Sequence, residues 1–487
     1  MQRKEITRML KLMTKTLITG VFLIGVTAAQ AHYTVSIGSG SAIKFVWVGH
    51  LQGGSNPCYV VDRSTDNPQK IEAYSNTGAK MWTVNFGPNS ANQDNISPGS
   101  GAICCGQWDG VTVYDVNGDG KDEVIIKFAS GVTFGDGTVW SNSDNNKQWI
   151  GVLEGATGKL LKYCSIPQDY ESIGPMAVQL GACPSGIYAV MKNRNADKSF
   201  NMMVCRYQMG SSLTMTWKWL RGSQDCPDGH TMRICDVNGD GTDDVGDIGF
   251  MLNGANGSLL YSLAGQGVIH GDRWAIAKMD KNNTSHYQGY GIQQDNPNGL
   301  YDYYYDATTG TMIWKHGGGG SDVDVGRGDV GDIDGSKAGY ESWAFNGVWN
   351  APSNKQLSPA GTEPWPEIGL WWDTDDLRES YNNGKIEKYD PSSTSTGRRV
   401  TRLYTITDYA SDATGNGTYP MFWGDFTGDW REEVIVCNSS YNKLYVLQPS
   451  GTPKTSRSNL YNDRYYKNGL TIKGYPQTVH TSFYLGE

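Results

Sequence analysis

An acidic loop of nine residues occurs twice in this chain, with the side chains of a calcium cage. Residues 115–123 read DVNGDGKDE, and residues 236–244 read DVNGDGTDD. Calcium prefers about six to eight oxygen ligands, and glycine permits the sharp turn between them. The spacing therefore predicts that both loops bind Ca²⁺, with these ligands: Asp115, Asn117, Asp119, Lys121, Glu123, Asp236, Asn238, Asp240, Thr242 and Asp244.

Two altered copies of this loop begin at Asp332 and at Asp425. We expect weaker or modified calcium sites there, with the ligands Asp332, Asp334, Asp425, Thr427, Asp429 and Glu433. The copies are not EF-hands, because they have no glutamate at the twelfth position and no flanking amphipathic helix. Short apolar runs follow instead, at 124–126 and 434–436, which is typical of strands. Four ordinary Asx turns without metal are the alternative interpretation.

A polar turn with glycine at its bend alternates with the acidic loops. It occurs at residues 74–78, 155–158, 254–257 and 306–310, and each copy precedes an apolar segment. Together with 62 Gly, 28 Tyr and 16 Trp, this alternation predicts an all-β protein. We expect a β-propeller of seven or eight blades with calcium-binding loops. The segment 483–485 is expected to close the ring by pairing with a strand from the N-terminal region.

The N-terminal segment is typical of a secretory signal peptide. Five basic residues precede an apolar core at 17–28, and Ala29 and Ala31 fit a small-x-small cleavage site. The core is too short for a stable membrane span, and the formal net charge of −9 argues against nucleic acid. Residues 1–31 are therefore the predicted signal, and residues 32–487 a single catalytic propeller domain, secreted to the periplasm or medium and monomeric.

The cysteine content is compatible with export, but the sequence does not define which cysteines would form disulfide bonds. All nine cysteines follow residue 31, and the odd number leaves at least one thiol without an intramolecular partner. No CxxC pair occurs, which disfavours a zinc ribbon or a thioredoxin-type site.

Four short motifs lie outside the needs of the repeat and occupy equivalent places near its loops. They are 228–230 (DGH), 270–272 (HGD), 326–328 (GRG) and 416–418 (NGT). In a propeller such places gather on one face around the axis. His and Asp could ligate a metal or exchange protons, or each His could only cap a turn. Arg327 between two glycines could grip the carboxylate of a polymer, or be a surface arginine without a role.

In their order along the chain, these motifs resemble the rhamnogalacturonan lyases of polysaccharide lyase family eleven. Further motifs carry the resemblance at 332–334, 339–341, 371–373, 377–379, 428–433 and 483–486, and it spans about residue 47 to 487. The resemblance implies an eight-bladed propeller with bound calcium. It also implies cleavage of pectic rhamnogalacturonan I between galacturonate and rhamnose by β-elimination.

The resemblance also implies roles for individual residues. Arg327 matches an active-cleft arginine, and His230, His270 and Asp272 match a metal cluster near the cleft. Asp62, Asn416, Gly417 and Thr418 match substrate contacts, and Tyr475 matches a cleft tyrosine. A family lysine after the substrate loop is missing, and Tyr419, Tyr475 or Lys44 could replace it. The family's fourth metal-binding acid is replaced by Gln294, unless Asp295 serves.

Two other functions remain open at the level of sequence. The missing lysine would suit a propeller that binds glycan or protein without turnover. A glycoside hydrolase would need paired carboxylates, for which Asp62, Asp272 and Asp373 are candidates.

Overall fold

The computed structural model describes residues 32–63, 65–90, 103–106, 108–144, 147–170, 176–195, 197, 199–317, 319–394, 397–413, 419–472 and 479–486. The predicted signal peptide (1–31), the loop residues Asn416, Gly417 and Thr418, and Tyr475 lie outside the described residues.

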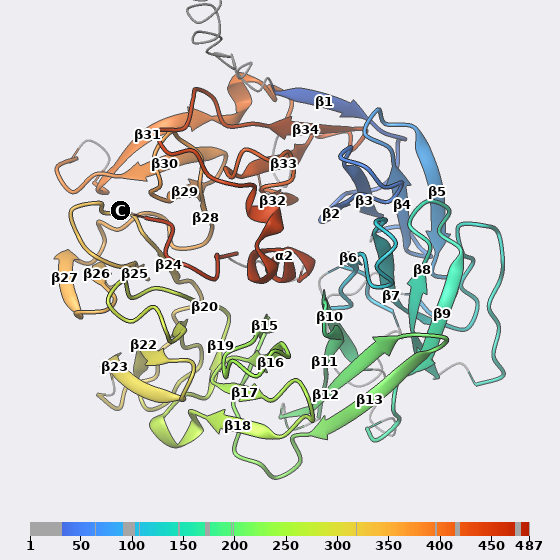
Figure 1. Ribbon diagram of the computed structural model, residues 1–487, viewed down its shortest axis with the longest axis horizontal. Helices are drawn as coiled ribbons and strands as arrows, with labels where there is room; N and C mark the ends of the chain where they lie inside the picture. The colour runs from blue at the N-terminus through green and yellow to red at the C-terminus, as the bar shows by residue number, and fades with distance from the viewer. Residues whose placement is uncertain are drawn as a thin grey trace, which may run out of the picture.

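Eight four-stranded antiparallel sheets are arranged radially within the described chain, as Figure 1 shows. Blade 1 comprises β2 (Val46–Gly49), β3 (Cys58–Arg63), β4 (Lys70–Tyr74) and β5 (Lys80–Asn85). Blade 2 comprises β6 (Thr112–Tyr114), β7 (Glu123–Ala129), β8 (Gln148–Leu153) and β9 (Leu160–Ser165). Blade 3 comprises β10 (Ala177–Cys183), β11 (Gly186–Arg194), β12 (Phe200–Met209) and β13 (Leu213–Leu220). Blade 4 comprises β15 (Arg233–Cys235), β16 (Asp244–Asp247), β17 (Phe250–Leu252) and β18 (Leu259–Ser262).

The second half of the ring repeats the same order. Blade 5 comprises β20 (Trp274–Ala277), β21 (Gln288–Ile292), β22 (Leu300–Asp306) and β23 (Thr311–Gly317). Blade 6 comprises β24 (Asp329–Gly331), β25 (Glu341–Trp343), β26 (Val348–Asn350) and β27 (Lys355–Ser358). Blade 7 comprises β28 (Gly369–Leu370), β29 (Glu379–Asn382), β30 (Lys385–Tyr389) and β31 (Val400–Thr405). Blade 8 comprises β32 (Phe422–Gly424), β33 (Glu433–Cys437), β34 (Lys443–Leu447) and, from the N-terminus, β1 (Tyr33–Ser36). Short 3-10 turns lie at Ala264–Gln266 (η2), Ile406–Asp408 (η3) and Leu460–Asn462 (η5).

Ring closure joins the two ends of the chain within blade 8. Antiparallel pairing runs from Tyr33↔Val446 to Ser36↔Lys443. The expected closing strand from the N-terminal region is therefore present, but the prediction that it pairs with residues 483–485 is wrong. Those residues form no strand, because the chain leaves the sheets after β34 and turns into the centre of the ring.

The burial pattern follows the place of each strand within its blade. All seven residues of β7 are buried, because neighbouring blades cover both faces of an inner strand. In the outer strand β23, exposed positions alternate with less exposed ones, and Trp314 is buried. The predicted glycine turns join the third and fourth strands. Gly158 and Gly310 have φ of 67° and 73° there, which glycine adopts without strain.

Alternating strand directions give the propeller two ends with different connections. The loop rim carries the turns between first and second strands, which include the acidic loops at 115–122, 236–243, 332–340, 371–378 and 425–432. The crossover rim carries the connections from one blade to the next, which include residues 221–232, 263–273, 319–328 and 359–368. The acidic loops and the motifs at 228–230, 270–272 and 326–328 therefore lie at opposite ends.

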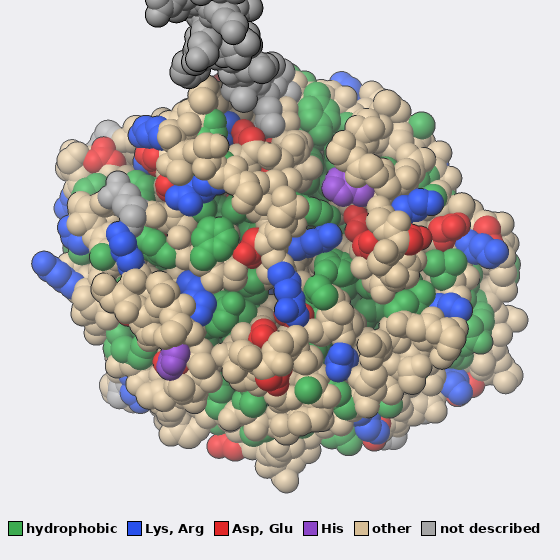
Figure 2. Space-filling view, viewed as in Figure 1, with side chains coloured by type: hydrophobic (Ala, Val, Ile, Leu, Met, Phe, Trp, Pro, Cys, Tyr) green, Lys and Arg blue, Asp and Glu red, His purple; other side chains and the backbone are tan. Residues whose placement is uncertain are grey.

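The helix α2 (Arg464–Thr471) occupies the centre of the loop rim. The carboxylate of Asp463 caps its N-terminus by accepting the backbone N–H of Tyr466 at 2.8 Å. Tyr466 donates its hydroxyl to Glu432 at 2.8 Å, and Asn468 donates to Asp243 at 3.2 Å, so α2 is tied to two acidic loops. Figure 2 shows this face, with basic side chains over its centre. No helix among the described residues is long and apolar enough to cross a membrane.

All nine cysteines lie in the described chain, and all are unpaired thiols. Eight of them are buried and Cys164 is partly exposed.

Candidate active site on the crossover rim

Two short parallel strands bring the predicted histidines together. In β14 (Asp228–Gly229) and β19 (His270–Gly271), Asp228 is opposite His270 and Gly229 is opposite Gly271. The glycines allow this approach, since a Cβ on Gly229 would lie 2.7 Å from the Gly271 carbonyl oxygen. The motif spacing in the sequence thus translates into adjacent side chains.

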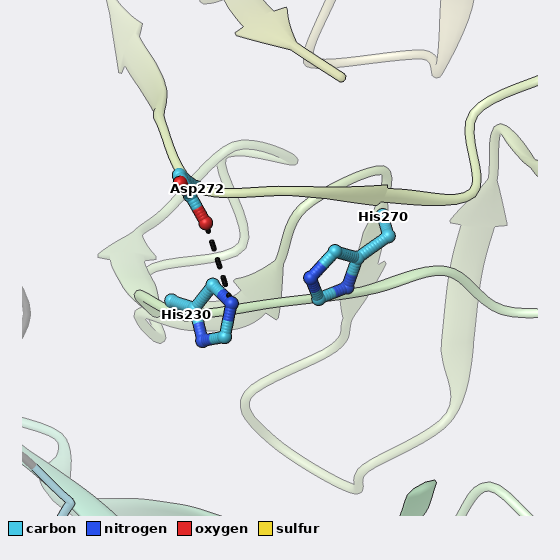
Figure 3. A group of neighbouring side chains, drawn as sticks. All are labelled: His230, His270 and Asp272. Carbon is cyan, nitrogen blue, oxygen red and sulfur yellow. Dashed lines mark ion pairs between the residues drawn. The ribbon is translucent and has the colours of Figure 1, made fainter. Parts of the chain in front are cut away.

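His230, His270 and Asp272 form one cluster, shown in Figure 3. One ligand atom from each lies within 4.8 Å of the others, and His230 Nε2 is 3.3 Å from an Asp272 carboxylate oxygen. The two imidazole rings are 4.9 Å apart between centres, at 85°. Two ring nitrogens and a carboxylate are suitable donors for a divalent cation, so the residues fit the metal cluster that the resemblance implies.

Asp228 holds His270 in one orientation. Its carboxylate lies 2.6 Å from His270 Nδ1, and Arg221 donates to its other oxygen at 2.7 Å. This contact places the proton of a neutral His270 on Nδ1 and leaves Nε2 for a ligand. Lys192, buried beside them, donates to Asp247 and to the Gly229 carbonyl. A charged layer from two blades therefore lies directly behind the cluster.

The two imidazoles differ in basicity. Burial, followed by the charge of Lys192, lowers the pKa of His230 to about 3. Burial also acts to lower the pKa of His270, but the hydrogen bond and charge of Asp228 outweigh it and raise that pKa. His230 is thus a neutral ligand and a weak base in this environment.

Arg327 lies beside this cluster with an accessible guanidinium. Its side chain is 45% exposed, and its Nε is 3.3 Å from Glu367. The guanidinium stacks over the Trp365 ring at 5.6 Å. A Cβ on the preceding Gly326 would lie 3.7 Å from an Asp272 carboxylate oxygen, which places the arginine loop next to the metal cluster. An anionic sugar could therefore contact both the Arg327 guanidinium and the metal cluster.

Glu367 connects Arg327 to Arg273, and Tyr419 lies nearby. Its second oxygen accepts from Arg273 Nη2 at 3.1 Å. The phenol of Tyr419 is close to both arginines. Burial raises the pKa of Tyr419 well above its usual value, although the charge of Arg273 opposes this rise. Tyr419 is therefore a neutral phenol with a buried hydroxyl.

Asp62 does not reach this cluster. Its side chain is fully buried in β3, and Oδ1 accepts the backbone N–H groups of Lys44 and Phe45, each at 2.8 Å. A carboxylate in this position fixes the segment before β2 and is not accessible to a polymer. Asp373 lies on the loop rim, so the three carboxylates considered for hydrolysis are not assembled into one site.

The loops of blades 2 and 4 fold alike around their first carboxylate. Asp115 accepts the N–H of Gly118 at 2.6 Å and of Gly120 at 2.9 Å, and Asp236 does the same for Gly239 and Gly241 at 2.8 and 3.0 Å. The final acid of each loop is buried. Burial and the neighbouring carboxylates raise the pKa of Glu123 and of Asp244 to about 7.

Clustered oxygens of one charge sign around a buried final acid are the donor set of a hard cation, so these two loops fit calcium. The copy at Asp425 keeps the same final acid, since burial and then Asp425 raise the pKa of Glu433 far above its usual value. In the remaining copy Asp334 bends back to accept from Ser336 at 3.0 Å. In the Asp425 loop Asp429 pairs with Arg431 at 2.5 Å, so each of these two copies diverts one predicted ligand.

Blade 7 has a fifth acidic loop that already contains a cation. Asp373, Asp375 and Glu379 converge, and Lys388 from β30 lies among them. Its ammonium is 2.6 Å from each aspartate and 3.4 Å from Glu379. Glu379 also accepts the N–H of Trp372 at 2.8 Å, as Glu123 accepts that of Val116 at 3.0 Å. A lysine thus occupies the position that a metal would take.

Sequence reasoning missed several residues of the crossover rim. Trp365 lies within, and Glu367 directly after, the segment 351–366, whose Pro, Ser and Gly content predicts only a long loop. Arg273 directly follows the motif at 270–272. The arginine-carboxylate pairs form between blades. The one available signal was the charge of Arg273 directly after the motif at 270–272.

The family profile of the C-terminal domain of rhamnogalacturonan lyase family 11 matches residues 202–487. Two curated proteins of Bacillus subtilis (strain 168) are similar over most of the chain. The rhamnogalacturonan endolyase YesW is 27% identical over 448 residues, which cover 86% of this chain and 67% of YesW. The rhamnogalacturonan exolyase YesX is 26% identical over 466 residues, which cover 85% of this chain and 71% of YesX.

Solved structures show the same fold. The crystal structure of YesW superposes with a TM-score of 0.79 at 24% identity, over 94% of this chain and 82% of that one. A family-eleven rhamnogalacturonan lyase from Bacillus licheniformis gives 0.78 at 24% identity, with the same coverage. The predicted all-β class and the eight-bladed propeller are confirmed. The chain belongs to rhamnogalacturonan lyase family 11 and is a polysaccharide lyase.

Proposed function

We propose that this lyase cleaves the backbone of rhamnogalacturonan I between galacturonate and rhamnose by β-elimination. The observation that carries the proposal is the accessible guanidinium of Arg327 beside the His230, His270 and Asp272 cluster. Both are suited to an anionic sugar, and the similar YesW and YesX are rhamnogalacturonan lyases by name.

The reaction moves one proton from carbon and one to oxygen. A base removes the proton at C5 of galacturonate, and the electrons of that bond form the double bond between C4 and C5. The bond between C4 and the glycosidic oxygen breaks. This oxygen stays on C1 of rhamnose and takes a proton, so that rhamnose becomes the new reducing end. Neutralising the uronate carboxylate makes the C5 proton more acidic.

Arg327 is suited to hold that carboxylate through paired hydrogen bonds, with Trp365 and Glu367 fixing the guanidinium. A divalent cation held by His230, His270 and Asp272 would supply additional positive charge for the same carboxylate. Tyr419, whose phenol lies beside Arg273, is our candidate for the group that protonates the leaving oxygen. The geometry of His230 and His270 favours ligation over proton abstraction, since Asp272 and Asp228 engage them.

Tyr475 and Lys44 are then the candidates for the base. A Tyr475→Phe or Lys44→Met variant that binds substrate normally and loses turnover would identify it.

The proposal includes calcium dependence and export. Calcium is supported by the oxygen donors of the loops at 115–123 and 236–244, and export by the signal-like segment at 1–31. We expect the mature protein to act on pectic polysaccharide outside the cytoplasm as a monomer.

The test is the structure of the products. Purified protein lacking residues 1–31 is incubated with rhamnogalacturonan I and calcium, and the oligosaccharides are analysed by mass spectrometry and NMR. Products with an unsaturated uronate at one end and rhamnose at the reducing end are expected. Products that have gained water would instead indicate hydrolysis.

A further inference from the structure

A small pocket opens on the crossover rim, and Asp228 and His230 form one edge of it. Its walls are aromatic and aliphatic, and polar groups border it on one side; the lining residues are Trp108, Ala177, Val190, Phe200, Gln179, Lys192, Asp228, Gly229 and His230. Its volume is about 20 Å³. A cavity needs roughly 10–15 Å³ to hold one water molecule, so this pocket admits a single methyl-sized group.

The polar groups at the edge of the pocket are engaged by the protein. Gln179 accepts the N–H of Met232 at 3.1 Å and donates to the carbonyl of His230. Lys192 is bonded to Asp247, and Asp228 to His270 and Arg221. The pocket therefore offers an incoming group mainly apolar contact, which favours a methyl over a water molecule that needs several polar partners.

Aromatic rings connect the pocket to the metal cluster. The Trp108 ring is 5.9 Å from that of His230, and Phe200 stacks on His270 at 6.3 Å with nearly parallel planes. Aromatic faces are suited to the apolar side of a sugar ring. A sugar on these rings would be the immediate neighbour of a sugar bound at the cluster.

We infer that this pocket receives the C6 methyl group of the 6-deoxyhexose next to the bound uronate, and so selects rhamnose. The inference rests on the proposed function, because in an alternating galacturonate–rhamnose polymer each neighbour of a uronate carries such a methyl. A hexose with a hydroxymethyl group in the same place would be too large and would lose its hydrogen bonds to water.

The first experiment fills the pocket. Ala177, half-buried at the start of β10, is changed to Val, and the exposed Ala255 on the loop rim is changed to Val as the matched control. Saturation-transfer NMR on a rhamnose–galacturonate tetrasaccharide measures contact with the methyl group. We expect Ala177→Val to abolish saturation of this methyl and to raise KM about tenfold with little change in kcat. Ala255→Val should leave both unchanged.

The second experiment enlarges the pocket. In Val190→Ala the affinity ratio between methyl α-L-rhamnoside and methyl α-L-mannoside, its 6-hydroxy analogue, should fall about tenfold from the wild-type value. Unchanged methyl saturation in Ala177→Val, with wild-type KM, would overturn the inference. Absence of lyase products from the wild type would instead overturn the proposed function, and the methyl saturation of the uncleaved tetrasaccharide would still decide the role of the pocket.

Discussion

The two rims of this propeller both gather carboxylates, but they neutralise them in different ways. On the loop rim, Asp115 and Asp236 are bound by backbone N–H groups of their own loops. On the crossover rim, side chains from neighbouring connections meet, as Asp228 meets His270 and Glu367 meets Arg273. The loops at 115–123 and 236–244 are therefore built from local contacts that suit structural ions. The crossover rim is built from contacts between blades and leaves an accessible arginine.

This difference leads to a division of roles. Changes on the crossover rim should reduce turnover and leave stability nearly unchanged, whereas changes on the loop rim should reduce stability first. Four variants test the division, in order of expected effect.

Arg327→Ala should lower kcat/KM about 10²–10³-fold, because one charged contact to the reacting carboxylate is lost. The unfolding temperature should stay close to that of the wild type, since the side chain is 45% exposed. Steady-state kinetics and thermal unfolding measure both quantities. The exposed Arg402→Ala in β31 is the control, and wild-type turnover in Arg327→Ala would refute the role of this residue.

Asp236→Ala should remove the calcium-dependent stabilisation that its loop provides. A site filled at a hundredfold excess of ligand over Kd contributes about 2.7 kcal/mol, so the difference in unfolding free energy between calcium and chelator should shrink by roughly that amount. Denaturant unfolding with and without calcium measures it. The same calcium effect in the variant and the wild type would show that the loop at 236–244 is an ordinary turn.

Lys388→Met tests the loop that carries its own cation. Three carboxylates lose their ammonium partner, so in chelator the free energy of unfolding should fall by about 2–3 kcal/mol. This loss is smaller than that for breaking a fully buried ion pair, because the lysine is partly exposed. Calcium should restore much of this loss, because the remaining oxygens resemble those of blade 2. Lys385→Met on the same strand is the control, and a loss that calcium does not change would separate the two kinds of loop.

Asp228→Asn should lower activity about 10–100-fold by releasing His270 from its orientation. The direct readout is the tautomer of His270 in ¹⁵N NMR, which should change from a pure Nδ1–H form to a mixture. Asp225→Asn in the same segment is the control. An unchanged tautomer would mean that Asp228 does not position the imidazole.

The sequence predicted the parts of this molecule that depend on local patterns. The acidic loops and glycine turns repeat within a few residues, so the propeller and the convergence of His230, His270 and Arg327 on one rim could be anticipated. Lys388 reaches its loop from a different strand, α2 packs into the centre, and β34 pairs with β1. These contacts join residues far apart in the chain, and no local pattern encodes them. Asp62 shows the converse limit, because a motif match does not reveal that a side chain is buried.

The most direct test of the account is the ultraviolet absorbance of the conjugated unsaturated uronate, followed during incubation with rhamnogalacturonan I. The account predicts a steady rise with calcium, loss of the rise in chelator and its recovery on adding calcium back, and a rate at least a hundredfold lower for Arg327→Ala. No rise for the wild-type protein in calcium, or an equal rise for Arg327→Ala, would contradict it.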